Sequence, residues 1–318
     1  MAVHEKCFVK EIKPEAFGAD SECGRKKIIA IQDLSCIGRC SGSVTLPVLS
    51  AAGITVNFIP TALLSAQTDG FENYTFRDLT EEMLPIARHW QTLQLHFDAV
   101  YTSFLGSLEQ LETVKQILFM LTDAQTLRFI DPVLGDDGVL YDCYDERYVE
   151  NMRNLCAVAD VITPNLTEAA FLTGLPYREG ACTQEYILQL FAALSKLGIK
   201  QYIVITGVCL REGQIGVAVY DCRSHEVFFL MTPSVSGRFP GAGDVFASAL
   251  LAAILNDIGI ETAAETALAY TANCIAESRK AGTPPRFGPD FEKSLWKLAE
   301  EIRKKRKPCA FHENGPGI

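Results

Sequence analysis

The most restrictive feature of this sequence is a regular alternation of short apolar runs with longer, helix-like stretches. The apolar runs have the length and composition of buried strands, and they lie at residues 28–31, 54–61, 98–105, 127–134, 160–163 and 201–206. The helix-like stretches comprise one that ends at residue 53 and those at 107–121, 146–156, 183–197 and about 242–257, 261–280 and 290–305. Such alternation predicts a doubly wound α/β fold, with a mostly parallel sheet and helices on both faces.

One segment departs from this alternation. Residues 215–231 contain two strand-like runs separated by a turn, which predicts an antiparallel addition at one edge of the sheet. Residues 1–25 show no clear periodicity and are interpreted as an N-terminal extension of uncertain order. Since no long linker interrupts the rest, residues 26–306 are expected to form a single domain, followed by a C-terminal tail at 307–318.

The charge and the cysteines indicate the type of ligand and the compartment. The chain has 318 residues and a formal net charge of −10, which disfavours nucleic acid and membrane surfaces as partners. No apolar run reaches the roughly 20 residues that span a bilayer. The 11 cysteines are odd in number and scattered, as expected for reduced thiols in the cytoplasm. We therefore expect a cytoplasmic protein that binds small molecules.

The most informative motif precedes the predicted helix at 242–257. Gly241, Ala242 and Gly243 lead directly into Asp244 and then into an apolar-periodic stretch. Backbone N–H groups at a helix N-terminus lack internal partners, and small residues let an anion approach them. The positive helix end should keep Asp244 ionised and able to accept a hydroxyl proton. A capped helix start without a ligand remains the alternative, because short glycine motifs often occur by chance.

Two further polar clusters follow predicted strands, at residues 131–136 and 163–168. Ligands of open α/β sheets bind at the carboxyl ends of the strands. Asp136, Asn165 and Glu168 carry the hard oxygen ligands that Mg²⁺ prefers. The alternative is that both clusters are ordinary turns. The sequence contains no Walker A pattern and no Gly-x-Gly-x-x-Gly after a strand.

These three motifs, Gly-Ala-Gly-Asp, Asp-Pro-Val-Leu-Gly-Asp and Ile-Thr-Pro-Asn-x-x-Glu, resemble those of the ribokinase-like superfamily. The pyridoxal kinase branch is the most similar, and the resemblance extends from about Lys27 to Leu298. It implies an ATP- and Mg²⁺-dependent kinase that assembles as a homodimer. Whether a monovalent cation is also needed stays open.

The resemblance also implies roles for the catalytic and magnesium-binding positions. Asp244 would be the catalytic base, and the three amides before it would form an anion hole. Asp136 and Glu168 would organise magnesium and the ATP phosphates, with Thr163 and Asn165 beside them.

The remaining roles concern the nucleotide and the substrate ring. Thr206 and Gly207, at the end of a strand, match a nucleotide-contacting position, and Thr68 matches a threonine near the substrate ring. The loop at 135–141 would cover the phosphates.

Three positions depart from or adapt the family pattern around the substrate. Asp33 stands where pyridoxal kinases commonly carry a serine that contacts the pyridine ring. Its carboxylate could pair with a protonated ring nitrogen or a substrate amine, or could signal another substrate. Phe104 replaces a frequent tyrosine and keeps a stacking surface, while Ser103 could supply a polar contact.

Four functions are candidates for a chain with these residues. The first is a kinase that transfers the γ-phosphate of ATP to the 5′-hydroxymethyl group of pyridoxal, pyridoxine or pyridoxamine, for salvage of pyridoxal 5′-phosphate. The second is a hydroxymethylpyrimidine kinase, although the glycine-rich first loop of its relatives is absent at 33–43. A sugar or nucleoside kinase should carry an early lid of antiparallel strands, and residues 34–97 show no clear hairpin pair. A silent vitamer-binding protein should have lost Asp244.

Overall fold

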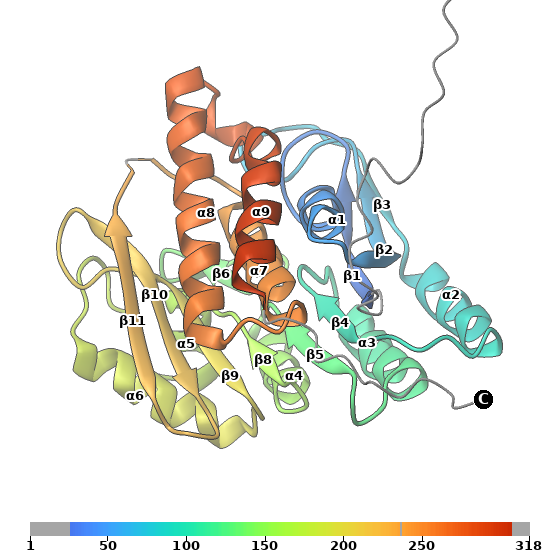
Figure 1. Ribbon diagram of the computed structural model, residues 1–318. Helices are drawn as coiled ribbons and strands as arrows, with labels where there is room; N and C mark the ends of the chain where they lie inside the picture. Colours follow the sequence, from blue (N-terminus) through green and yellow to red (C-terminus); the bar gives the residue numbers. More distant parts are fainter. Residues whose placement is uncertain (1–25, 236, 307–318) are drawn as a thin grey trace, which may run out of the picture.

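The computed structural model describes residues 26–235 and 237–306 (Figure 1). The expected N-terminal extension at 1–25 and the tail at 307–318 lie outside these residues. Within the described ranges, none of the helices has the length and apolar character needed to cross a membrane.

One nine-stranded sheet forms the centre of the molecule, in the order β11-β10-β9-β8-β5-β4-β1-β2-β3. Its strands are β1 (Lys27–Ser35), β2 (Thr55–Leu64), β3 (Phe76–Asp78), β4 (Ala99–Thr102), β5 (Leu127–Ile130), β8 (Val161–Ile162), β9 (Tyr202–Val208), β10 (Gln214–Asp221) and β11 (Val227–Pro233). From β9 to β2 in that order, each strand is parallel to its neighbour. The expected mostly parallel sheet is confirmed.

Both edges of the sheet are antiparallel, whereas the sequence indicated only one. The β10–β11 pair confirms the predicted addition at 215–231. At the other edge β3 pairs antiparallel with β2, so the expectation of no hairpin pair within 34–97 was wrong. All three residues of β3 are exposed, so this strand lacks the alternation of buried and exposed side chains that reveals a strand in a sequence.

Helices cover both faces of the sheet, as predicted (Figure 1). One face is covered by α1 (Gly42–Ala51), α7 (Ala242–Leu255), α8 (Ile260–Ala281) and α9 (Leu295–Lys305). The other is covered by α2 (Thr80–Thr92), α3 (Leu108–Leu121), α4 (Glu146–Cys156), α5 (Leu166–Thr173) and α6 (Gln184–Leu194). Short 3₁₀ turns lie at η2 (Ser195–Leu197), η3 (Pro285–Phe287) and η4 (Glu292–Ser294).

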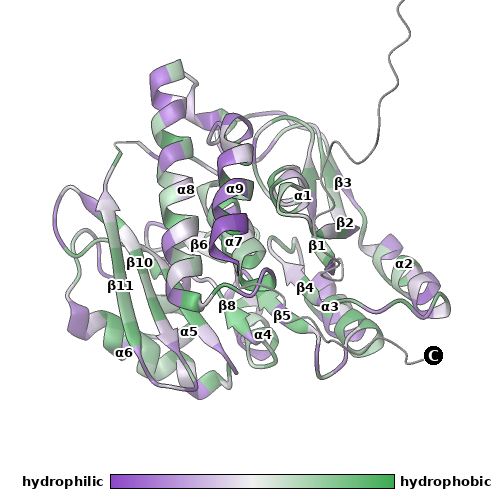
Figure 2. Ribbon diagram, in the orientation of Figure 1, coloured by the Kyte–Doolittle hydropathy of each residue, from purple (hydrophilic) through white to green (hydrophobic). Residues whose placement is uncertain are grey.

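The central strands are apolar on both sides because successive side chains point to opposite faces. Ile28 belongs to the core under α7 and α8, and the next residue, Ile29, to the core under α2–α6. Ile203 and Val204 repeat this division in β9. Figure 2 shows the hydrophobic interior strands and the hydrophilic outer surface of α9.

Besides β3, three features were not anticipated: α2, α5 and the two-stranded hairpin of β6 (Gly135–Asp136) and β7 (Val139–Leu140). The strand expected at 127–134 ends at Ile130. A tight turn follows it, in which the Val133 N–H donates to the Asp131 carbonyl at 2.9 Å. Pro132, which has no N–H, cannot continue the ladder.

Candidate active site

The Gly-Ala-Gly-Asp motif forms the first turn of α7, where the sequence placed it. Gly241 has φ 82°, and a Cβ atom at this position would collide with the carbonyl oxygen of Arg39. Only glycine satisfies both requirements. The Ala242 N–H donates to the Phe239 carbonyl at 3.1 Å, so this amide of the expected anion hole is engaged in a turn in this structure. The Gly243 backbone is exposed at the same turn.

Asp244 lies at the centre of a polar cluster. The Ser103 hydroxyl donates to Asp244 Oδ1 at 3.2 Å, and the nearby backbone N–H of Ser41 also lowers the pKa of this carboxyl. Burial, with a smaller contribution from nearby Asp33, raises the pKa of Asp244 to about 6. We expected the helix end to keep this group ionised; desolvation instead brings its pKa close to neutrality. At pH 7 most of it is still ionised and able to accept a proton.

Asp33, which the resemblance implies as a substrate-contacting residue, lies near Asp244. Its side chain is 5% exposed, and the Ser35 hydroxyl donates to it at 3.3 Å. The register of β1 against β2 shifts between Gln32 and Leu34, so the irregularity falls at Asp33. Burial raises the pKa of Asp33. The structure therefore brings two carboxylates, Asp33 and Asp244, into one polar cluster.

Asn165 and Glu168 form a capping box at the start of α5. The Asn165 side chain accepts from the Glu168 N–H at 2.8 Å, and Glu168 accepts from the Asn165 N–H at 2.7 Å. Glu168 also accepts from the Leu134 N–H at 3.2 Å. Burial and nearby Asp131 raise the pKa of Glu168 well above its usual range.

Asp131 was not assigned a role from the sequence, although it begins one of the motifs. It accepts a hydrogen bond from Thr163 Oγ1 at 2.9 Å. Burial and the charge of Asp244 raise its pKa to about 7. Asp131 thus connects the cluster around Asp244 to the cluster around Glu168. In the sequence, its position directly after a buried strand was the signal that could have indicated a functional role.

Arg238 is a second residue that the sequence analysis left without a role. Its guanidinium lies 3.1 Å from Asp136, 3.3 Å from Asp69 and 3.5 Å from Asp137. It therefore joins the loop before α7 to the β6–β7 hairpin and to the loop between β2 and β3. Burial raises the pKa of Asp136 although Arg238 opposes this. The signal in the sequence was its position inside the glycine-rich segment at 237–244.

Thr206 and Gly207 lie next to the 163–168 cluster at the end of β9. The Thr206 N–H donates to the Pro164 carbonyl at 2.9 Å, and Gly207 has φ 69°. A cavity of about 490 Å³ adjoins them, lined among others by Gly207, Cys209, Gly213 and Ser234. This cavity and the capping box lie at the same ends of neighbouring strands.

The two remaining predicted substrate residues differ in their surroundings. Phe104 is partly buried, and its ring lies 6.1 Å from that of Tyr144 in a tilted arrangement. Thr68 is exposed in the loop between β2 and β3, next to Asp69, and stands outside the buried cluster around Asp244.

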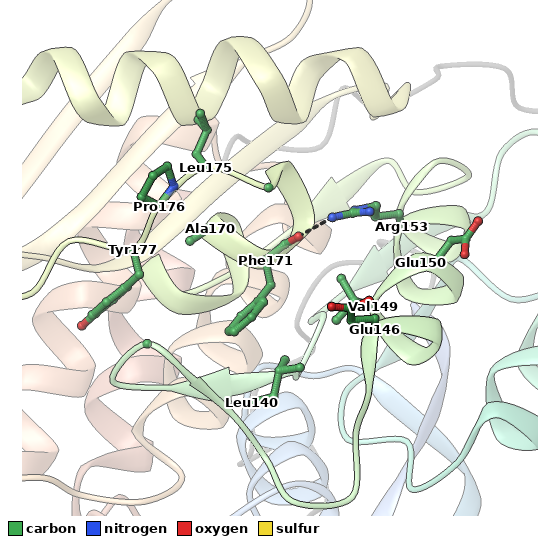
Figure 3. Close-up of a pocket in the computed structure, with 12 residues that line it drawn as sticks. Leu140, Glu146, Val149, Glu150, Arg153, Ala170, Phe171, Leu175, Pro176 and Tyr177 are labelled. Carbon is green, nitrogen blue, oxygen red and sulfur yellow. Dashed lines mark hydrogen bonds between the residues drawn. The ribbon is translucent and has the colours of Figure 1, made fainter.

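A larger cavity, of about 550 Å³, opens between α4, α5 and the β6–β7 hairpin (Figure 3). Leu140 and Phe171 provide apolar walls, and Arg153 donates to the Phe171 carbonyl at 2.6 Å. Asp244 is not among the residues that line it. The cavity lies behind the hairpin, away from the catalytic cluster.

Asp136 and Glu168 are the candidate ligands of a magnesium ion. Within the described parts of the chain, no group of three or more His, Cys, Asp or Glu residues forms a ready-made metal site. Such a group is not required for Mg²⁺, which keeps several waters and binds one or two carboxylates together with substrate phosphates. Asp136, partly exposed at the hairpin, and Glu168, whose pKa is raised by burial and then by nearby Asp131, fit this chemistry.

The fold and the site together define a kinase that transfers phosphate to a hydroxyl group: a doubly wound sheet with a carboxylate in the first turn of a helix at the ligand-binding edge. A family model described as phosphomethylpyrimidine kinase matches residues 46–288. The chain belongs to this family. The resemblance to the pyridoxal kinase branch of the ribokinase-like superfamily is confirmed.

Individual relatives cover most of the chain. A Bacteroides thetaiotaomicron protein bearing the same family description is 34% identical, has a TM-score of 0.83, and covers 88% of this chain and 96% of its own. It has also been crystallised with pyridoxal. Pyridoxal kinase from Lactobacillus plantarum is 31% identical with a TM-score of 0.80, covering 89% of this chain and 99% of its own. A pyridoxine/pyridoxal/pyridoxamine kinase of Bordetella avium is 26% identical over 82% of this chain and 88% of its own.

Proposed function

We propose that this protein uses MgATP to phosphorylate the 5′-hydroxymethyl group of a vitamin B6 compound. The observation that carries the proposal is the position of Asp244, in the first turn of α7, hydrogen-bonded to Ser103 and beside Asp33. A carboxylate with a pKa of about 6 is well matched to accepting a hydroxyl proton near neutral pH. The relatives named for pyridoxal and its congeners support the substrate class.

In this mechanism Asp244 accepts the proton of the substrate hydroxyl and aligns its oxygen for in-line attack on the γ-phosphate. The Gly243 backbone and the N-terminus of α7 lie where the transferring phosphate needs hydrogen-bond donors. Asp33 faces the ring of the substrate, where its carboxylate can hold a protonated nitrogen. Phe104 offers an aromatic surface for the ring.

On the nucleotide side, Asp136 and Glu168 would hold magnesium, with Thr163 and Asn165 beside them. The ion supplies charge neutralisation for the phosphates. Arg238 forms an ion pair with Asp136 in this structure, so this ion pair has to break before Asp136 can hold magnesium. Thr206 and Gly207 border the cavity that would receive the nucleotide.

We propose further that residues 26–306 form one kinase domain that works in the cytoplasm as a homodimer. The continuous nine-stranded sheet supports a single domain. Light scattering of the purified protein measures the oligomeric state directly, and a monomer at working concentrations would contradict this part of the proposal.

Hydroxymethylpyrimidine kinase is the second candidate, because the matching family is described as phosphomethylpyrimidine kinase, an activity on a related pyrimidine. Its substrate is also a heteroaromatic alcohol and would use the same base. Asp33 argues for the vitamin B6 compounds, because it places a carboxylate beside the ring.

A coupled assay of ADP release separates these candidates, with pyridoxal, pyridoxine, pyridoxamine and hydroxymethylpyrimidine tested in parallel. We expect turnover on at least one vitamin B6 compound. Turnover on hydroxymethylpyrimidine alone would move the protein to the second candidate. The Asp244→Asn variant should lose phosphorylation on every substrate and retain ATP binding, because the loss falls on the chemical step. A variant that kept most of its turnover would contradict the mechanism.

A further inference from the structure

Arg39 makes an unusually complete set of contacts for a residue outside the motifs. Its Nη2 lies 2.9 Å from Asp290 Oδ1, and its Nε lies 2.7 Å from Glu292 Oε1. Its backbone N–H donates to the Phe287 carbonyl at 3.1 Å, and its Nη1 reaches the same oxygen at 3.4 Å. The Asp290 side chain is only 7% exposed, and Thr283 donates to its second oxygen at 2.7 Å. Arg39 is therefore fixed to the segment that follows α8.

The backbone of Arg39 also contacts the glycine-rich turn that begins α7. A Cβ atom on Gly241 would collide with the Arg39 carbonyl oxygen. A Cβ atom on Gly288 would lie 2.8 Å from the same oxygen and 3.0 Å from the Pro240 carbonyl. Three segments, the loop before α1, the turn before α7 and the segment after η3, thus meet at Arg39 with no room between them.

Two residues after Arg39, the chain adopts a conformation that a side chain disfavours. Ser41 has φ 43° and ψ −128°, a region that glycine enters readily and serine does not. Ser41 is 5% exposed. In this conformation its backbone N–H lies near Asp244 and its side chain near Asp33, and each lowers the pKa of the carboxyl beside it. A conformation of this kind persists only when the surrounding structure holds it.

We propose that Arg39 is a positioning residue: its clamp on the segment after α8 holds Ser41 in the left-handed conformation that directs a backbone N–H at the catalytic carboxylate. The catalytic part of this inference rests on the proposed function. Arg39 itself does not touch the substrate. Its guanidinium is paired with Asp290 and Glu292. It acts on Ser41 through the backbone of Cys40, which lies between them.

The groups that face Asp244 determine what loss of the clamp should do. The Ser41 N–H and the Ser103 hydroxyl favour the ionised carboxylate, whereas burial and Asp33 oppose it. Asp244 in turn acts on the ionisation of the groups around it, which are Cys40, Tyr101 and Asp131. None of the groups named here is a cation that could compensate for a lost contact. Loss of the Ser41 N–H should therefore disfavour the ionised form of Asp244 and raise its pKa.

Cys40 provides a test that does not depend on turnover. It is half-buried between Arg39 and Ser41, while Cys36 in the same loop is exposed and serves as an internal reference. In Arg39→Met we expect the rate of Cys40 alkylation by iodoacetamide, relative to Cys36 and measured by peptide mass spectrometry, to rise at least tenfold. Arg39→Lys and Glu292→Gln should give smaller increases, because each retains part of the clamp.

The matched control is Lys26→Met, which removes the ion pair to Asp98 at the opposite end of β1. This variant should leave Cys40 alkylation unchanged. A Cys40 rate within twofold of the wild type in Arg39→Met would overturn the proposal. An equal increase in Lys26→Met would overturn it as well, because the effect would then be general loosening.

Kinetics test the catalytic part. In Arg39→Met we expect kcat to fall at least tenfold with the KM for ATP within threefold, and the acid limb of the pH–rate profile to move to higher pH. A loosened Cys40 with unchanged kcat and pH profile would show that the clamp does not serve catalysis. A wild type that phosphorylates none of the substrates would contradict the proposed function, while the alkylation rates would still decide whether Arg39 positions Ser41.

Discussion

At the scale of single residues, the site depends on a carboxylate held between opposing influences. Burial raises the pKa of Asp244, whereas the hydrogen bonds from Ser41 and Ser103 lower it. The result, a pKa of about 6, is one that a general base needs near neutral pH. Small changes in its hydrogen bonds should therefore be visible in the pH dependence of the reaction.

We predict that kcat/KM rises with pH through an apparent pKa near 6, because Asp244 accepts a proton only when ionised. Ser103→Ala removes a donor to the charged form and should move this limb to higher pH. Steady-state rates between pH 5 and 8.5, in steps of about half a unit, measure the apparent pKa in the wild type and its shift in the variant. Ser195→Ala, partly exposed on η2 and remote, is the control. An unshifted limb in Ser103→Ala would show that this hydrogen bond does not act on the base.

Asp33 should decide which vitamin B6 compound is preferred. Replacing it with serine, the residue common in pyridoxal kinases, removes a carboxylate that can pair with a substrate amine. We expect kcat/KM for pyridoxamine relative to pyridoxal to fall about tenfold, the effect of roughly 1.4 kcal/mol. Asp33→Asn, which keeps the shape without the charge, should behave similarly. An unchanged ratio in both variants would place the amine elsewhere.

At the scale of elements, the β6–β7 hairpin is attached to α5 at its base and to the loop before α7 near its tip. Asn165 Nδ2 donates to the Gly135 carbonyl at 2.9 Å, and the Gly138 N–H donates to Thr167 at 2.9 Å. Arg238 pairs with Asp136 and Asp137. The residue that caps α5 therefore also positions the hairpin expected to cover the phosphates.

We predict that Asn165→Ala lowers stability by about 1 kcal/mol through loss of the cap and also raises the KM for ATP severalfold, because the hairpin loses its anchor. Asp145→Ala is a closely matched control. Asp145 caps α4 by accepting from the Tyr148 N–H at 2.9 Å. It should lower stability by a similar amount and leave the KM for ATP unchanged. An equal change in the KM for ATP in both variants would show that the hairpin anchor does not contribute to nucleotide binding.

At the scale of the whole molecule, the ligand-binding edge concentrates buried carboxylates that the fold tolerates only at a cost in stability. The pKa of Asp131 is raised by burial and by Asp244, that of Asp244 by burial and Asp33, and that of Glu168 by burial and Asp131. Groups with raised pKa bind more protons in the folded than in the unfolded state between the two pKa values. Their contribution is present at low pH and lost as pH rises through the folded pKa.

The ligand-free protein should therefore become less stable as pH rises from about 5 to 7.5, in buffer without divalent cations. Asp131 alone, with a pKa of about 7 against an ordinary 3.8, should contribute about 2–3 kcal/mol to this loss. Asp131→Asn should raise the thermal midpoint at pH 7.5 and flatten its pH dependence. Thermal unfolding across that range is the measurement, and an unchanged pH dependence in the variant would contradict the assignment.

The strongest sequence predictions concerned elements with strong local patterns. The buried strands, the helix after the Gly-Ala-Gly-Asp motif and the antiparallel edge at 215–231 all carry apolar periodicity, and all are present. By contrast β3 is short and exposed, and α5 was hidden because its capping box, Asn165 and Glu168, also fits a metal-binding motif. The metal-binding role stays a prediction, and the helix cap that these two residues form was missed.

The sequence by itself determined the fold class and the reaction type and predicted Asp244 as the catalytic base, because each follows from patterns within a few neighbouring residues. Tertiary structure alone decided the roles of Arg39, Arg238 and Asp131. Each acts on partners far away in the chain: Arg39 on Asp290, and Arg238 on Asp69 and Asp136. It also decided the protonation of Asp244, since desolvation depends on what packs around a group and not on its neighbours in sequence.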